Sequence, residues 1–147
     1  KPIIMSTGMA TLEEVRDALD ILLEAGAKKE DITILHCNTE YPTPMEDVNL
    51  QAMLTIGNEL GVAVGYSDHT LGIEIPIAAV AMGATWIERH ITLDRIMWGS
   101  DQMSSVEPGG LIKLVKGIRD IEKSLGTSGP RQPLGSELAK RKSLRGV

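Results

Sequence analysis

The chain of 147 residues has little of what marks secreted and membrane proteins. It contains a single cysteine, Cys37, so no disulfide can form within it, and we expect a reducing, cytoplasmic location. No apolar run reaches the roughly 20 residues that a membrane-spanning helix requires, and no signal peptide opens the chain. We therefore expect no membrane partner.

Basic residues are also outnumbered by acidic ones. Against 20 acidic residues there are 15 lysines and arginines, and the net charge of -5 argues against nucleic acid as a partner. The hydrophobic content of 42% is enough for a core, and the length is that of one domain. The chain does not start with methionine, and its first residues already lie in an expected strand. We therefore expect a piece of a longer protein.

What the chain does contain is an alternation of strand-like and helix-like segments. Short β-type runs predict strands over residues 3–6, 32–37, 62–67 and 86–91. Apolar residues at helical spacing predict helices over residues 12–25, 48–60, 72–82 and 111–125. The first helix has the clearest start, because Thr11 and Glu14 have the spacing of a capping box.

This alternation predicts an α/β fold with parallel strands and right-handed crossovers. An open doubly wound sheet and a (β/α)8 TIM barrel both satisfy that topology. Because a complete barrel typically needs about 250 residues, four units would make half of one. The tail over residues 127–147 contains glycine, proline and basic residues, and we interpret it as a linker.

Two histidines stand at the ends of successive strands. His69 follows the third expected strand, and His90 lies at the end of the fourth. Neighbouring parallel strands are roughly 4.8 Å apart, so both imidazoles can reach one divalent ion. Two imidazole ligands leave other positions of the ion open for water and substrate, as catalysis requires. The alternative is that each is an ordinary hydrogen-bonded histidine.

Side chains alternate between the two faces of a strand, which predicts the companions of the two histidines. Both common parallel folds place their active sites at the carboxyl edge of the sheet. Hydroxyls, amides and backbone N–H groups there suit an anionic ligand such as phosphate or carboxylate, although short polar residues also cap helices. The expected inward-facing strand ends are Ser6, Asn38, Ser67, His69, Glu88 and His90.

Several short motifs follow one another in order along the chain. They are ILHC (34–37) followed by Tyr41-Pro42, GYSDHT (65–70), IERHITLD (87–94), GSDQ (99–102) and SVEP (105–108). Together they resemble the N-acetylneuraminic acid (sialic acid) synthases. That resemblance implies condensation of phosphoenolpyruvate with an N-acetylmannosamine-type sugar, with release of phosphate.

The same resemblance implies an architecture. Members of this family have a (β/α)8 barrel followed by an antifreeze-like domain, and they form homodimers. Residues 1–126 would then hold barrel strands five to eight. Residues 127–147 would be the linker towards the absent antifreeze-like domain, and we expect the isolated piece to be inactive.

The resemblance also implies roles for individual residues. His69 and His90 match two metal ligands, usually for manganese (Mn2+) or magnesium (Mg2+), and so take part in catalysis. Ser6 and Ser67 match contacts to phosphoenolpyruvate.

The sugar-binding positions implied by the resemblance are Tyr41, Glu88 and Asp101. Before Tyr41, either Asn38 or Thr39 faces the ligand, and strand alternation favours Asn38. Glu88 could orient the sugar or move a proton in catalysis, and its alternative role is an ion pair with an arginine such as Arg89 or Arg95. The alternative for Asp101 is a loop-capping aspartate that bonds its own backbone.

Other functions stay open beside sialic acid synthesis. Within the family, the product could be a legionaminic, pseudaminic or deaminated nonulosonic acid, or the sugar could be a 6-phosphate. In another class, the chain would be an inactive half-barrel that acts only in assembly. Such a sheet has two open edges and an exposed apolar face, which a partner or a second copy must cover.

Overall fold

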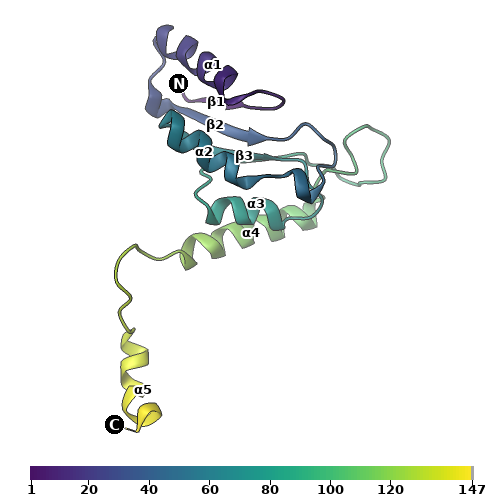
Figure 1. Cartoon of the computed structure of the whole chain (residues 1–147). Helices are drawn as coiled ribbons and strands as arrows, with labels where there is room; N and C mark the ends of the chain where they lie inside the picture. Colours follow the sequence, from purple (N-terminus) through teal and green to yellow (C-terminus); the bar gives the residue numbers. More distant parts are fainter. Residues whose placement is uncertain (147) are drawn as a thin grey trace.

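A computed structural model describes residues 1–146. The elements in chain order are β1 (Ile3–Ser6), α1 (Leu12–Glu24), β2 (Ile32–Cys37), α2 (Leu50–Leu60), β3 (Ala63–Asp68), α3 (Glu74–Ala81), β4 (Ile87–Arg89), α4 (Pro108–Ser124) and α5 (Gly135–Arg145). Two short 3-10 turns, η1 (Lys29–Asp31) and η2 (Met45–Asp47), precede β2 and α2. Strands and helices thus alternate as the sequence predicts (Figure 1).

The four strands form one sheet in the order β1-β2-β3-β4, and every neighbouring pair is parallel. In a doubly wound sheet the strand order reverses at a switch point, whereas barrel strands follow one another in sequence order. The predicted half-barrel with parallel strands is therefore confirmed.

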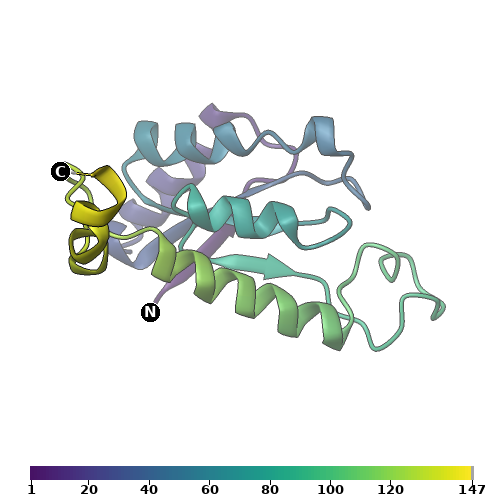
Figure 2. The same ribbon diagram turned by 90° about the horizontal axis from the view of Figure 1, so that it is seen from below.

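Helices cover one face of this sheet. The buried residues of a first core cluster, between α1, β2 and α2, are Val15, Leu19, Ile32, Ile34, Ile56 and Leu60. Those of a second cluster, which reaches β3 and α3, are Val48, Met53, Tyr66, Ala79 and Ala84. Burial of one such aliphatic side chain contributes about 1.5–3 kcal/mol. Further along the chain, α3 and α4 lie side by side (Figure 2).

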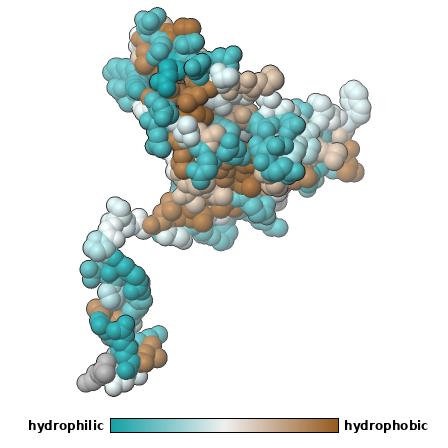
Figure 3. Space-filling model, in the orientation of Figure 1, coloured by the Kyte–Doolittle hydropathy of each residue, from teal (hydrophilic) through white to brown (hydrophobic). Residues whose placement is uncertain are grey.

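The opposite face of the sheet carries exposed apolar side chains. Ile4 of β1 is 44% exposed, and Trp86, just before β4, is 48% exposed. Gly65 of β3 allows the close approach of Trp86, because a Cβ there would lie 2.5 Å from the Trp86 carbonyl oxygen. Brown apolar patches are also visible on the body in Figure 3, whereas α5 is mainly hydrophilic. The open face of the sheet is therefore only partly polar.

The start of α1 forms as the sequence predicts. The Glu14 N–H donates to Thr11 Oγ1, and the Glu14 carboxylate accepts the Thr11 N–H at 2.7 Å. These contacts satisfy two of the N–H groups that a helix N-terminus leaves without intrahelical partners. The same hydrogen bonds hold the pKa of Glu14 below its ordinary value.

Some element boundaries differ from the prediction. The second helix begins at Leu50 because Asn49, with φ of 45°, follows the η2 turn in a left-handed conformation. The fourth helix begins at Pro108, since proline suits the first turn of a helix. Strand β4 has only three residues, so His90 lies just beyond it.

The tail interpreted as a linker contains a helix that was not predicted. The Leu134 N–H donates to the Glu137 carboxylate at 2.7 Å, and Arg131 pairs with the same carboxylate at 2.9 Å. These contacts stabilise the first turn of α5, which lies apart from the sheet in Figure 1. Neither α5 nor any other described helix is long and apolar enough to cross a membrane.

Candidate functional site

The carboxyl edge of β3 and β4 brings four predicted site residues together. Ser67 and Glu88 are partners in the strand register, and Ser67 Oγ donates a 2.7 Å hydrogen bond to Glu88 Oε1. One residue beyond the two strands, the ring centroids of His69 and His90 lie 5.2 Å apart, with their planes at 73°. A hydroxyl–carboxylate pair thus lies next to an imidazole pair.

Strand alternation accounts for this arrangement. Tyr66 of β3 and Ile87 of β4 pack in the second core cluster, on the helix-covered side. Their successors Ser67 and Glu88 therefore face the open side of the sheet. The two histidines follow two residues later and belong to the same alternating set.

The buried ring of His69 is held in one orientation. Its Nδ1 lies 2.6 Å from the carbonyl oxygen of Asn38 and 4.0 Å from Cys37 Sγ. Because a carbonyl can only accept, Nδ1 donates to it, and in a neutral imidazole Nε2 is then the nitrogen with the free lone pair. Metal-binding histidines are commonly oriented through their second nitrogen in this way. His69 is therefore set up to act as a ligand through Nε2.

His90 is half-buried and faces the loop between β4 and α4. Its Nδ1 lies 3.9 Å from Asp101 Oδ2, a distance that allows electrostatic attraction but not a hydrogen bond. Asp101 is held by its backbone, because Ser104 Oγ and Ser105 Oγ both donate to its carbonyl oxygen. Its carboxylate is therefore directed by the loop towards the histidine pair.

The ring of Tyr41, in the loop after β2, lies against both histidine rings. Its ring centroid lies 4.1 Å from that of His69 and 5.6 Å from that of His90. Burial raises the pKa of Tyr41, and the charges of Cys37 and Asp101 raise it further. The phenol therefore remains protonated at neutral pH and can donate a hydrogen bond.

The donor set fits part of a metal coordination shell. Within residues 1–146, no group of three or more His, Cys, Asp and Glu side chains is arranged to hold a metal ion. Two imidazoles, one of them oriented through its second nitrogen, do suit a divalent transition metal. The other positions would fall to water, substrate or groups outside this chain, which is the pattern of a catalytic rather than a structural site.

The orientation that strand alternation predicted for Asn38 does not hold. Its set includes Ile34 and His36, but Ile34 lies in the first core cluster and His36 Nε2 bonds a carbonyl in the loop before α2. At the end of β2 it is instead Cys37 that faces the open side, where its Sγ lies 4.0 Å from His69 Nδ1. The Asn38 side chain bonds its own loop through the Glu40 N–H, and only its backbone carbonyl reaches His69.

Ser6 and Thr39 lie towards the β1 side of the site. Ser6 is exposed on the open face of β1, opposite Leu35 of β2 in the register. Thr39 is exposed beside Gly8, where a Cβ would come within 2.6 Å of Thr39 Cγ2. The loops after β1 and β2 are thus in close contact, but Ser6 is two strands away from Ser67.

A charged pair beside the histidines was not predicted. Asp68 and Arg89 form a buried ion pair on the helix-covered side of β3 and β4. Arg89, one of the two arginines considered as partners of Glu88, is thus already engaged, and burial lowers its pKa from the ordinary value. The sequence did contain a sign of this ion pair, because Asp68 and Arg89 are charged residues at strand positions where alternation predicts apolar ones.

The sequence profile of the NeuB family matches residues 1–129. The chain belongs to the NeuB family. Among similar NeuB relatives, N,N'-diacetyllegionaminic acid synthase of Campylobacter jejuni is 52% identical over 126 residues, which cover 86% of this chain and 38% of that protein. The enzyme of the same name from Legionella pneumophila is 44% identical over 146 residues, covering 98% of this chain and 41% of that protein.

A solved structure shares the fold. The crystal structure of N-acetylneuraminic acid (sialic acid) synthetase from Leptospira borgpetersenii, in complex with citrate, superposes with a TM-score of 0.83 at 38% identity. The match covers 99% of this chain and 50% of that one. The chain therefore spans half or less of the NeuB proteins that it resembles.

Proposed function

We propose that this chain is part of the catalytic barrel of a nonulosonic acid synthase, a cytoplasmic transferase that joins phosphoenolpyruvate to an N-acetylmannosamine-type sugar and releases phosphate. The observation that carries this proposal is the pairing of Ser67–Glu88 beside His69–His90 at one strand edge. Membership in a family that includes sialic and legionaminic acid synthases supports the same reaction class.

The reaction needs no nucleophile from the protein. C3 of the enol phosphate attacks the aldehyde carbon of the open-chain sugar, which forms the new C–C bond. Water then adds at C2, and its proton balances the alkoxide left on the sugar. The tetrahedral centre at C2 expels phosphate and leaves a 2-keto acid. The protein therefore has to align two substrates and to place one proton.

The residues at the strand edge suit those tasks. The Ser67 hydroxyl can rotate from Glu88 to an oxygen of phosphoenolpyruvate, which frees the Glu88 carboxylate for a sugar hydroxyl or a proton. Tyr41 can donate to the sugar, and Asp101 can accept from it. Each of these groups comes from a different strand end or loop, as is usual in barrel enzymes.

We also propose that His69 and His90 hold a divalent ion, manganese or magnesium. Such an ion, when bound, polarises the sugar aldehyde as a Lewis acid. The chain's own contribution is to orient the His69 ring through the Asn38 carbonyl, so that Nε2 faces the proposed ion site.

A second candidate substrate is a sugar with two acetamido groups. The relatives with 52% and 44% identity are N,N'-diacetyllegionaminic acid synthases, whereas the sialic acid synthetase structure is 38% identical. Phosphoenolpyruvate carries no nitrogen, so both acetamido groups of such a product must come with the sugar. This candidate differs from the first only in the sugar subsite.

We further propose that the full-length protein is a homodimer. The loop after β4 extends beyond the strand ends, and Leu93, Ile96 and Trp98 on it are exposed (Figure 2). Apolar side chains close together on this loop are more stable when they pack against a protein partner than when they face water.

The test is phosphate release by the full-length protein that contains this chain. Phosphoenolpyruvate would be supplied with N-acetylmannosamine, with its 6-phosphate, or with a diacetamido hexose, with and without Mn2+, and the products would be weighed by mass spectrometry. We expect a nonulosonic acid from one of these sugars, and only with the metal. Phosphoenolpyruvate left unconsumed with every sugar would refute the proposal.

A further inference from the structure

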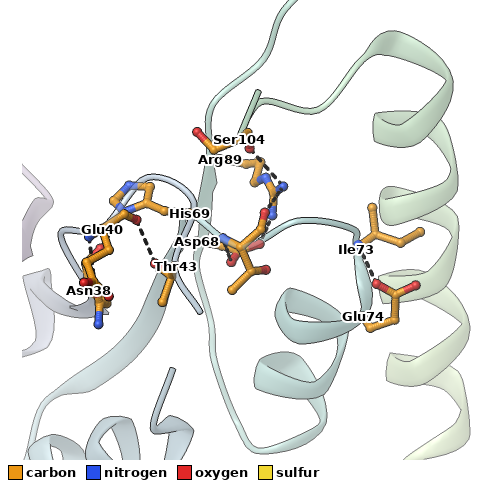
Figure 4. A network of polar contacts seen from close by, with 10 residues as sticks. Asn38, Glu40, Thr43, Asp68, His69, Ile73, Glu74, Arg89 and Ser104 are labelled. Atoms are coloured by element: carbon orange, nitrogen blue, oxygen red, sulfur yellow. Dashed lines mark hydrogen bonds and ion pairs between the residues drawn. The ribbon is translucent and has the colours of Figure 1, made fainter. Parts of the chain in front are cut away.

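A second pair of residues stands at the ends of the two strands, next to the histidines but facing the other way. Asp68 precedes His69, Arg89 precedes His90, and Asp68 and Arg89 are partners in the register of β3 and β4. Their side chains form an ion pair with 0% and 5% of their surfaces exposed. The pair is therefore almost completely withdrawn from solvent, and Figure 4 shows it from close by.

Arg89 is bonded in three directions. Besides the Asp68 carboxylate, its guanidinium donates to the carbonyl of Thr70 at 2.6 Å and to that of Ser104 at 3.1 Å. Asp68 Oδ1 in turn accepts the Thr70 N–H at 2.9 Å. One guanidinium thus connects the chain after β3, the end of β4 and the loop that follows β4, as Figure 4 shows.

The loop held by Arg89 is the one that carries Asp101. Ser104 Oγ and Ser105 Oγ donate to the Asp101 carbonyl at 3.0 and 2.8 Å. The Asp101 carboxylate lies 3.9 Å from His90 Nδ1. A set of contacts therefore leads from the buried pair through the loop to Asp101 and His90, and Asp68 is joined directly to His69 in the chain.

Stability alone gives little reason for such a pair. Withdrawing two charges from water costs several kcal/mol for each ion, and apolar residues of similar volume are often as stable or more so. The preceding helix-side positions of these strands are indeed occupied by Tyr66 and Ile87. The ion pair instead gives a defined geometry, because a planar guanidinium holds the groups that it bonds in fixed positions.

We propose that Asp68 and Arg89 are positioning residues that hold His69, His90 and Asp101 in place; the proposal rests on the function proposed above. Both side chains lie on the helix-covered side of the sheet, away from the proposed substrate and ion sites. Lysine at position 89 would keep the charge but lacks the fork that holds one carboxylate and two carbonyls together. The geometry of the site, rather than the fold, should therefore depend on arginine at this position.

The experiment compares the full-length wild-type protein with Arg89→Lys and with Leu19→Ala. Leu19 is buried between α1 and the sheet, so its variant reports the effect of lost stability alone. The first readout is the dissociation constant of Mn2+. The second is the set of imidazole NMR signals of His69 and His90, recorded without metal, with His36 on the helix-covered side of β2 as the reference.

In Arg89→Lys we expect Mn2+ binding to weaken about 10-fold or more, as for other residues that orient metal ligands. The imidazole signals of His69 and His90 should shift or broaden, and the His36 signal should not. Leu19→Ala should lower the melting temperature without either change. Wild-type Mn2+ affinity and wild-type imidazole signals in Arg89→Lys would overturn the proposal, whatever its melting temperature.

If Arg89→Lys does not fold, Asp68→Asn replaces it, because asparagine keeps the shape of aspartate and can still accept from Arg89. The same changes are expected at smaller size, and their absence has the same consequence. A wild-type protein that forms no nonulosonic acid would refute the proposed function, whereas the imidazole signals would still decide this inference.

Discussion

The two faces of the sheet are built from the same strands, but the open face, apolar at Ile4 and Trp86, becomes polar towards the strand ends. On the helix-covered face, Ile32 and Ile34 of β2 are fully buried among aliphatic residues of α1 and α2. On the open face, Ser6 is exposed, and Ser67 donates to an exposed Glu88. Because successive residues of a strand point to opposite faces, residues that pack the core and residues that could do chemistry are direct neighbours in the chain.

This separation has a consequence for mutations. Changes on the helix-covered face should lower stability and leave the folded protein active. Changes on the open face should lower activity and leave stability nearly unchanged. The Asp68–Arg89 pair is the proposed exception, since it lies on one face and acts on the other.

The largest effect should follow from loss of either histidine of the open face. His69→Ala or His90→Ala removes one of the two imidazole donors, and the transition-state stabilisation at stake is several kcal/mol. At 1.36 kcal/mol for each factor of ten, we expect kcat/KM of the full-length enzyme to fall about 1,000-fold or more. Steady-state phosphate release measures this, with circular dichroism as the control for folding. Full activity in either variant would contradict the metal role of the histidines.

The converse prediction concerns the helix-covered face. Leu19→Ala removes a buried side chain of the first core cluster and should lower the free energy of unfolding by about 2–5 kcal/mol. Urea unfolding of the full-length protein measures this loss, and kcat for the folded enzyme should stay within about twofold of wild type. A large fall in kcat at unchanged stability would show that the two faces are not separate.

A smaller effect is expected from the loop that faces His90. Asp101→Asn keeps the size of the side chain but removes its charge, and charge-assisted hydrogen bonds contribute about 1.5–3 kcal/mol. We expect KM for the sugar to rise about 10-fold, with KM for phosphoenolpyruvate little changed. Initial rates with one substrate varied at a time measure both constants. Equal changes in both, or none, would favour a structural role for Asp101 in its loop.

The helix-covered face was also the more predictable from sequence. The heptad-like spacing of Leu12, Val15, Leu19 and Leu22 predicted the buried side of α1, because helical periodicity is a local property of the chain. The open-face positions Ser67 and Glu88 followed from their two-residue spacing to His69 and His90. In both cases a few residues close together in the chain were enough to predict which side chains face the core and which face the open side.

Prediction failed where the signal was not local. In β2, the four residues from Ile32 to Leu35 are all buried, so no alternation marks which side Asn38 would take. The Asp68–Arg89 pair depends on the register of two strands, which neither strand contains by itself. The helix α5 was missed because nearby glycine and proline residues outweighed its good helix formers.

The smallest effect should be a pH dependence that belongs to α1 alone. Hydrogen bonds from the backbone and side chain of Thr11 lower the pKa of Glu14 from its ordinary value of 4.5. A carboxyl group whose pKa is lower in the folded state stabilises the fold above its unfolded pKa, and that contribution disappears as the pH falls through the folded pKa. The stability advantage of wild type over Glu14→Gln should therefore be present at pH 7 and shrink as the pH falls below 4.5.

Urea unfolding of both proteins at pH 7 and at pH 3 measures this difference. Because the Glu14 carboxylate is fully exposed, solvent screens the effect and keeps it small. Glu14→Asp is the matched control, since it keeps the charge but is too short to reach back to Thr11. A difference between wild type and Glu14→Gln that is equal at both pH values would mean that the capping contact does not depend on the carboxylate charge. Turnover at pH 7 should be the same in all three proteins, because the contact lies on the helix side and not at the strand edge.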